Sequence, residues 1–186
     1  MALTTVARAQ QNNVLASVNA VFLLELLEAA SDIIENYCNR TFATTTHTEI
    51  HDGDGLNQLV LDHAPVDSIT TITLTDNDGT ETEIAGDQFR VDLGAAIVRF
   101  APESTADYSS FPLGFRNISV VYIAGWDAIP EDVQQATVEL IEAAVEHEPA
   151  IASERMGDYA VAYRSAMEQL SPVTRAVLAH YRRIYV

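Results

Sequence analysis

Apolar residues recur every three or four positions between residues 14 and 38. An α-helix turns once in 3.6 residues, so this spacing predicts one amphipathic helix from about Val14 to Cys38. Asn12 or Asn13 can act as its N-cap, because an Asn side chain accepts a hydrogen bond from a free N–H of the first turn. The predicted buried stripe consists of Leu15, Val18, Phe22, Leu26, Ala29, Ile33 and Tyr37.

From Thr41 the pattern changes to short runs rich in Thr, Val and Ile, which are separated by Gly, Asp and Asn. Asp78-Gly79 lies between two of these runs and predicts a type I′ hairpin turn, and Pro65 marks a strand start or an edge strand. These runs predict a small antiparallel sheet. Its strands are expected at residues 44–50, 58–61, 68–75, 80–84, 88–92, 95–100 and 117–124.

Helical periodicity returns at Pro130, which suits the first position of a helix, and Pro149 is expected to end that helix. Residues 159–163 alternate between large and small side chains, which predicts a short strand or an extended arm. Ser171-Pro172 begins a terminal helix. The predicted buried faces consist of Val133, Ala136, Leu140, Ile141 and Ala144 in the first helix and of Val173, Val177, Tyr181 and Ile184 in the second.

The order of these elements predicts an α+β fold. A small helical bundle (residues 14–40 and 130–186) receives an antiparallel β-sheet insertion (residues 41–125), all within a single subunit of 186 residues.

The charge is strongly negative, with 27 acidic residues against 10 basic residues, all of them Arg, and a net charge of −17. Such a charge argues against binding of nucleic acid, which depends on Lys and Arg, and it opposes unguided self-association. Residues 41–163 carry 22 acidic and 4 basic side chains, whereas residues 164–186 carry four Arg and one Glu. This basic tail either docks on a partner or folds back on the acidic residues of its own chain.

No pattern in the sequence supports catalysis. The Asp-Gly pairs are typical of β-turns and lack the carboxylates that a calcium loop needs at its first and last positions. His47 and His51 would share one face of a strand, but zinc would need at least one further ligand. Cys38 is the only cysteine, so no intrachain disulfide forms, and no apolar run is long enough to span a membrane. We therefore expect a non-enzymatic protein with no metal and no cofactor. The alternative is an acidic, metal-dependent enzyme.

Five segments, which follow one another in order and cover most of the chain, carry a resemblance to a known family. They are Ile33–Phe42, Leu59–Ile69, Val120–Ala136, Ser153–Tyr159 and Leu170–Arg183. In sequence, order and spacing these segments resemble the tailed-phage head–tail connector family, also called adaptor or head-completion proteins.

This resemblance implies a structural virion protein that forms a ring, usually of twelve subunits, below the capsid portal. Its partners would be the portal, a stopper or tail-terminator protein, and its own copies, with DNA only in transit through the channel. The protein would lie in the virion neck, which would be assembled in the host cytoplasm. A different neck or tail-completion module is the alternative within the virion.

Two contacts are expected. The segment Met156, Gly157, Asp158 and Tyr159 is expected to contact a neighbouring subunit. Arg and Tyr are enriched at the centres of interfaces, so the terminal segment is expected to contact the portal. The residues of this second site are Arg175, Tyr181, Arg182, Arg183, Ile184, Tyr185 and Val186. The alternative is that Tyr181 and Ile184 only pack on helices of their own subunit.

Overall fold

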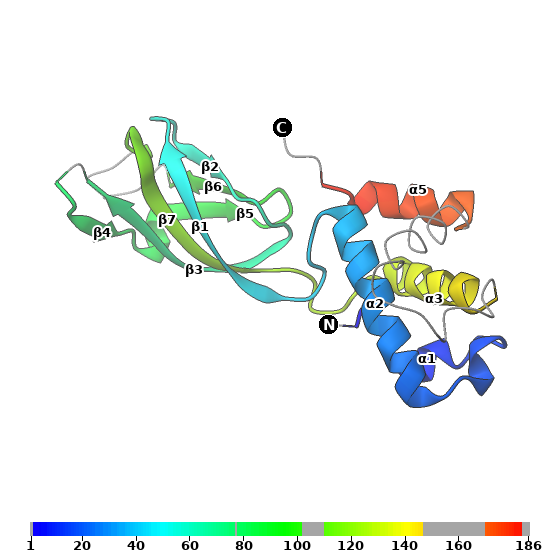
Figure 1. Cartoon of the computed structure of the whole chain (residues 1–186). Helices are drawn as coiled ribbons and strands as arrows, with labels where there is room; N and C mark the ends of the chain where they lie inside the picture. Colours follow the sequence, from blue (N-terminus) through cyan, green and yellow to red (C-terminus); the bar gives the residue numbers. More distant parts are fainter. Residues whose placement is uncertain (1, 77, 102–109, 147–169, 184–186) are drawn as a thin grey trace. The chain divides into compact units, whose positions relative to one another are not determined.

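The computed structural model describes residues 2–76, 78–101, 110–146 and 170–183. The chain divides into two compact units, which we call the helical unit (Met1–Ala43 with Ala128–Val186) and the β unit (Thr44–Asp127). Figure 1 shows helices in the first and antiparallel strands in the second. This composition confirms the α+β fold class.

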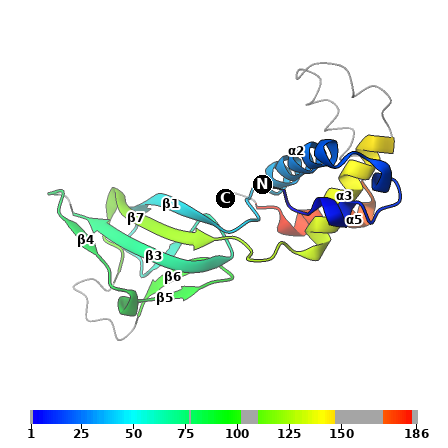
Figure 2. The same ribbon diagram turned by 90° about the horizontal axis from the view of Figure 1, so that it is seen from below.

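The helical unit contains α1 (Val6–Ala9), a 3-10 turn η1 (Leu15–Ser17), α2 (Ala20–Cys38), α3 (Glu131–Glu146) and α5 (Pro172–Tyr181). Helices α2, α3 and α5 pack against one another, and α1 packs against α2 (Figures 1 and 2). No helix within the described residues is both long and apolar enough to cross a lipid bilayer.

Helix α2 begins six residues later than the periodicity predicts. Val18 has an extended backbone with a ψ of 137°, which separates η1 from α2. The N-cap is therefore Asn19, whose side chain accepts a hydrogen bond from the N–H of Val21. Asn12 instead closes a turn with the N–H of Val14 and donates to Glu142 on α3 at 3.0 Å.

The buried stripe of α2 is also displaced by one position from the predicted one. It consists of Leu23, Leu27, Ala30, Ser31, Ile34 and Cys38. Of the residues predicted to be buried, Leu15 is buried, Phe22 is 44% exposed, and Leu26, Ala29, Ile33 and Tyr37 are half-buried. Apolar residues occur in adjacent pairs along this helix, so two neighbouring stripes satisfy the same period.

Helix α3 buries Val133, Ala136, Leu140 and Ile141 as predicted, while Ala144 is half-buried. The helix begins at Glu131, and the carbonyl of Pro130 accepts its first hydrogen bond, from Gln134 at 3.0 Å.

Helix α5 begins at Pro172 after Ser171, as predicted, but its buried residue is Leu178. Val173 is 73% exposed, which corrects the predicted face, and Val177 and Tyr181 are half-buried. Pro149, the segment 159–163 and Ile184 lie outside the described residues.

All seven predicted strands are present in the β unit. They are β1 (Thr45–Gly53), β2 (Gln58–Val60), β3 (Val66–Thr75), β4 (Glu81–Glu83), β5 (Phe89–Asp92), β6 (Ile97–Phe100) and β7 (Gly114–Ala124), and a short turn η2 (Gly86–Gln88) precedes β5. A four-stranded sheet has the order β1-β7-β3-β4 and a three-stranded sheet the order β2-β6-β5, both antiparallel. Buried side chains of both sheets form one core, which includes Leu59, Ile72, Leu74, Val98, Ile118 and Val120.

The β3–β4 hairpin forms where Asp78-Gly79 predicts it, but its loop is one residue longer than a type I′ turn. The N–H of Asp76 donates to the carbonyl of Thr80 at 2.9 Å. The N–H of Gly79 donates to the carbonyl of Asp76, also at 2.9 Å. Gly79 has a φ of +87°, which matches the left-handed residue that closes a three-residue hairpin loop. Pro65 directly precedes β3, as predicted.

Candidate docking site

The C-terminal ends of α2 and α5 lie together in the helical unit. The backbone N–H of Arg183 donates to the carbonyl of Cys38 at 2.8 Å, and the Cys38 thiol donates to the carbonyl of Leu178. The ring of Tyr181 packs edge-on against Phe42, with 5.6 Å between the ring centroids. Burial raises the pKa of Cys38 to about 11, which keeps the thiol neutral. The end of α5 is therefore fixed to its own subunit.

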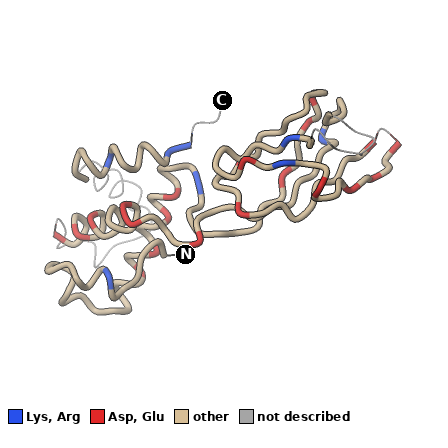
Figure 3. The backbone as a smooth tube through the Cα atoms, turned by 180° about the vertical axis from the view of Figure 1, so that it is seen from behind, with Lys and Arg blue, Asp and Glu red and all other residues tan. Residues whose placement is uncertain are grey.

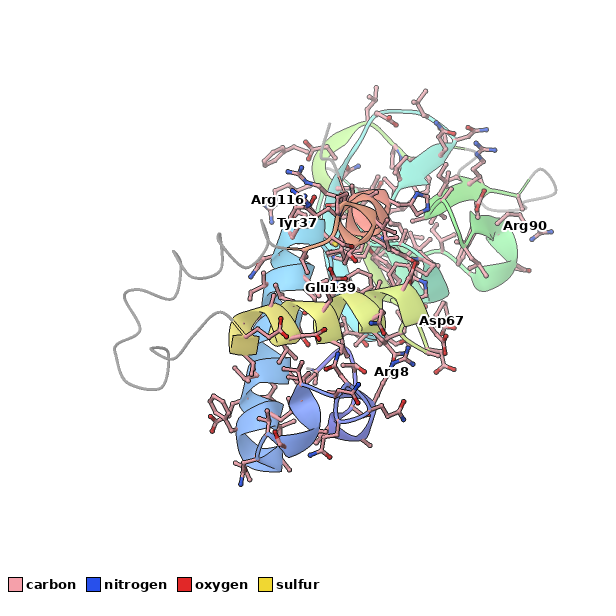
Figure 4. The ribbon with its side chains drawn as sticks, turned by 90° about the vertical axis from the view of Figure 1, so that its right-hand side faces the viewer. Arg8, Tyr37, Asp67, Arg90, Arg116 and Glu139 are labelled. Carbon is pink, nitrogen blue, oxygen red and sulfur yellow. The ribbon has the colours of Figure 1, made fainter. Side chains whose placement is uncertain are left out.

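The start of α5 is fixed equally well. The Ser171 hydroxyl accepts a hydrogen bond from the N–H of Thr174 at 3.1 Å, as an N-cap does. Glu139 on α3, labelled in Figure 4, accepts bonds from the N–H of Ser171 and from the Thr174 hydroxyl. Because both ends are held, α5 presents its outer side chains from a fixed support.

The residues of the predicted portal contact divide into two groups. Tyr181 donates its hydroxyl proton to the Asp132 carboxylate at 3.0 Å, and partial burial together with Asp132 raises its pKa. Tyr181 is therefore engaged within its own subunit. Arg175 and Arg182 are exposed, and the Arg182 guanidinium lies 5.6 Å from the centroid of the Tyr37 ring. Figure 4 labels Tyr37 on α2.

Arg40 was not predicted as part of this site but lies at the same end of the unit. Burial lowers the pKa of Arg40, and the nearby Arg183 lowers it further. Cations are favoured at helix C-termini, where unpaired carbonyls leave a partial negative charge. Arg40, Arg182 and Arg183 therefore form a basic cluster beside the ends of two helices. The other predicted contact residues, Ile184, Tyr185, Val186 and Met156–Tyr159, lie outside the described residues.

A second polar cluster is buried in the β unit around Glu49, whose side chain is only 9% exposed. Its carboxylate accepts hydrogen bonds from His51 Nε2 and His63 Nδ1, both at 2.8 Å, and from the hydroxyl of Tyr122. The backbone N–H of Asp62 donates to both of its oxygens, at 3.1 and 2.9 Å. Glu49 thereby ties the segment after β2 to β1 and β7.

The electrostatics of this cluster favour a charged carboxylate. Burial alone would raise the pKa of Glu49, but the hydrogen bonds from His51, Tyr122, Asp62 and His63 outweigh it and lower the pKa to about 2. The ring of His47 stacks on His63 with 3.7 Å between the centroids, and burial, followed by His63, lowers the pKa of His47.

The sequence places His47 and His51 on one face of a strand, and the structure confirms this. It also shows that Glu49, which shares this face by the same two-residue period, was overlooked. No group of three His, Cys, Asp or Glu side chains among the described residues has the arrangement needed to hold a metal ion. Because its acceptor oxygens are occupied by donors of its own unit, we assign this cluster to folding.

Comparison with known proteins identifies the family. Residues 8–184 match the model described as "Head completion protein". The chain belongs to the head completion protein family. This membership confirms the resemblance predicted from the sequence and assigns the chain a structural role in the virion, not an enzymatic one. No curated protein is similar enough in sequence to match it.

Solved structures share the fold of this head completion protein at low sequence identity. A chain described under "Neck of empty GTA particle computed with C6 symmetry" matches with a TM-score of 0.59 and 20% identity, over 99% of this chain and 91% of that chain. The same values hold for a chain from "Virion of native gene transfer agent (GTA) particle". One from "Neck of native GTA particle computed with C12 symmetry" has a TM-score of 0.57 and 20% identity, and the match covers 97% and 89% of the two chains.

Proposed function

We propose that this chain forms a ring of twelve subunits in the virion neck, between the capsid portal and a stopper or tail-terminator protein. The observation that carries this proposal is the match to head completion proteins over residues 8–184. The fold shared with proteins of particle necks, solved with sixfold and twelvefold symmetry, supports it. Assembly takes place in the host cytoplasm.

The charge of the chain suits passage of a genome. DNA binds to surfaces that carry Lys and Arg, and it is repelled by carboxylates. A ring of subunits with a charge of −17 each would give a strongly negative wall, along which DNA slides in transit without binding.

The portal contact is proposed at the C-terminal end of the helical unit. Arg175 and Arg182 are exposed there, Arg183 adjoins them, and residues Ile184, Tyr185 and Val186 follow directly. Tyr181 holds the helix that presents these arginines, through Asp132 and Phe42. Residues 156–159, which belong to the helical unit, are the proposed contact with the neighbouring subunit.

The portal contact is best tested with side-chain substitutions, because a deletion from residue 175 onward would also remove Leu178, which is buried. We expect the double variant Arg175→Gln with Arg182→Gln to bind purified portal rings at least about tenfold more weakly, since interface arginines are frequent hot spots. Thermal unfolding should not change.

Arg8→Gln is the matched control, because Arg8 lies in the same unit and forms an ion pair with the exposed Glu131 at 3.6 Å. Binding of the double variant at the level of wild type and Arg8→Gln, measured by electron microscopy and by co-sedimentation with portal rings, would place the portal contact elsewhere. Absence of the wild-type chain from purified necks would refute the neck assignment itself.

A further inference from the structure

Among the described residues of the β unit, four strands lie at the edge of a sheet, and β1 differs from the other three. The sheet orders β1-β7-β3-β4 and β2-β6-β5 place β1, β4, β2 and β5 at the edges. Figure 2 shows β1 along one side of the four-stranded sheet. An edge strand exposes unpaired backbone N–H and C=O groups, so proteins usually keep such strands short or place charged side chains on them.

The other three edge strands follow this rule. β2 and β4 have three residues each, and β5 has four. β4 carries the exposed Glu81 and Glu83, and β5 carries the exposed Arg90 and Asp92. Figure 3 marks the acidic and basic positions along the strands. These three edges therefore give a further strand little length to pair with, and two of them also oppose it with charge.

β1 has neither protection. It is nine residues long and pairs with β7 in continuous register from Thr45 to His51. The only Asp, Glu, Lys or Arg side chain in this stretch is Glu49, which is buried and accepts hydrogen bonds from its own unit. The register becomes irregular only after His51. Within the described part of the β unit, β1 is therefore the one long edge strand without an exposed charge between these residues.

The strand registers show which backbone groups of β1 point away from β7. In an antiparallel pair, the N–H and C=O of one residue point to the same side, and successive residues point to opposite sides. The N–H of Ile84 donates to the carbonyl of Ile72, so the backbone groups of Ile72 face β4. Val120 lies opposite Ile72 and therefore turns its own groups towards β1, where it meets Glu49.

Since Glu49 faces β7, its neighbours in β1 face the other way. The residues that point to the free edge are Thr46, Thr48 and Ile50. The described residues provide no hydrogen-bond partner for the N–H and C=O groups of these three. Thr46 and Thr48 are exposed, and Ile50 is 51% exposed. The edge therefore presents alternating donors and acceptors to which an extended segment can add as a further strand.

Residues 159–163, which lie outside the described residues, have a sequence that suits this edge. Tyr159, Val161 and Tyr163 alternate with alanines, and such alternation predicts a strand. The segment carries no charge and has the same length as the stretch Thr46–Ile50. A single short strand is not stable by itself, so it needs the edge of a sheet to pair with.

The chain between α3 and α5 is also longer than the two helices need. Glu139 on α3 accepts hydrogen bonds from Ser171 and Thr174 at the start of α5. Helix α3 ends at Glu146, about 10 Å beyond Glu139. Residues 147–169 lie between the helices, roughly three times the usual upper length of a connection between packed helices. The middle of such a segment can reach on the order of 30 Å from both helices.

We infer that residues 159–163 of one copy add a strand to the free edge of β1 in the neighbouring copy of the ring. The inference rests on the proposed ring, and it gives the proposed contact at residues 156–159 its counterpart. Thr46, Thr48 and Ile50 are exposed in the single chain, so the covering strand comes from another molecule. Copies with a charge of −17 repel one another, and contact is least opposed where neither exposed surface carries a charge. The free edge and the added strand both meet this condition.

Amide hydrogen exchange of the full wild-type chain tests the edge directly. In the free chain, the amides of Thr46, Thr48 and Ile50 should exchange rapidly, whereas those of His47 and Glu49, which face β7, should be protected. In rings formed on portal, the three edge amides should exchange at least about tenfold more slowly. Mass spectrometry with fragmentation of the peptides resolves the individual amides. Unchanged exchange in complete rings would overturn the inference and leave the neck assignment intact, and edge amides already protected in the free chain would overturn it as well.

A photo-crosslinking amino acid at position 48 identifies the segment that covers the edge. In rings assembled from equal amounts of isotopically labelled and unlabelled chains, it should link to a peptide that contains residues 159–163. About half of the linked pairs should join a labelled to an unlabelled chain. Links within one chain only, or to the portal or another segment, would overturn the inference. A wild-type chain that forms no ring on portal would refute the proposed function, and this inference with it.

A proline substitution separates assembly from folding. Thr48→Pro removes the central N–H of the free edge and leaves the bonds of β1 to β7 in place, so thermal unfolding of the free chain should change little. Ring formation on portal should need about tenfold more protein, because one donor is lost and the proline ring obstructs the added strand. Thr48→Val keeps the N–H and should assemble like wild type. Ring formation by folded Thr48→Pro at the wild-type concentration would contradict the proposed strand addition.

Discussion

Replacing Glu49 with Gln should destabilise the β unit strongly at neutral pH. The substitution keeps the size of the side chain but removes a charge that accepts hydrogen bonds from His51, His63, Tyr122 and the N–H of Asp62. An amide has one acceptor oxygen in place of two, so its NH2 group would face donors.

The magnitude follows from the pKa of Glu49. Lowering it from an ordinary 4.5 to about 2 corresponds, at 1.36 kcal/mol per pKa unit, to about 3 kcal/mol of stability. Little of this is lost to solvent screening, because the side chain is only 9% exposed. For a unit of this size, the midpoint of thermal unfolding should fall by at least about 10 °C.

The pH dependence gives the sharper test. Because the pKa is lowered in the folded state, the stabilisation is complete above pH 4.5 and is lost as the pH falls towards 2. The difference in unfolding free energy between wild type and Glu49→Gln should fall from about 3 kcal/mol at pH 7 to about 2 at pH 3.5 and about 1 at pH 2.5. Urea denaturation across this range measures it.

Glu81→Gln is the control, because it removes the same charge from an exposed position on β4 of the same unit. It should change the unfolding free energy by less than about 0.5 kcal/mol at every pH. A cost of Glu49→Gln below about 1 kcal/mol at pH 7, or one that does not vary with pH, would refute the reasoning.

Substitutions in each of the two units give further predictions. Gly53→Ala should destabilise the β unit by more than about 2 kcal/mol in urea denaturation, because a Cβ there would lie 1.7 Å from the carbonyl oxygen of Pro112. Gly86→Ala is the control. A Cβ at position 86 would meet no atom within 4 Å, so this variant should be nearly as stable as wild type. Ser171→Ala should cost the helical unit about 1 kcal/mol, because the N–H of Thr174 loses its cap; calorimetry should show no change in the β unit.

The strands were easier to predict from the sequence than the helix faces. A strand places alternate residues on opposite faces, and turn residues separate the runs from Thr44 to Ala124, so the elements follow from local pattern. In α2 the apolar residues occur as pairs such as Phe22-Leu23 and Ile33-Ile34, and both members satisfy the helical period. Packing against α3 and α5 selects the second member, and that choice depends on residues more than 90 positions away in the sequence.

The Glu49 cluster was not predicted for a related reason. Its members come from β1, from the segment after β2 and from β7, and His63 and Tyr122 are 59 residues apart. The histidine spacing suggests metal ligands, and in a chain with 27 acidic residues one carboxylate between two histidines is expected by chance. The local signal was the two-residue period of His47, Glu49 and His51, which places all three on the inner face of one strand.

The Glu49 cluster contrasts with the outer face of the four-stranded sheet. Among the described residues of the β unit, Glu49 is the only buried carboxylate, and four donors of its own chain bind it. The outer face of β1, β7 and β3 carries no charged side chain over three rows. A buried carboxylate without such donors is costly, and an exposed one repels another copy of the same chain. The positions without charge are therefore as informative as the charged ones.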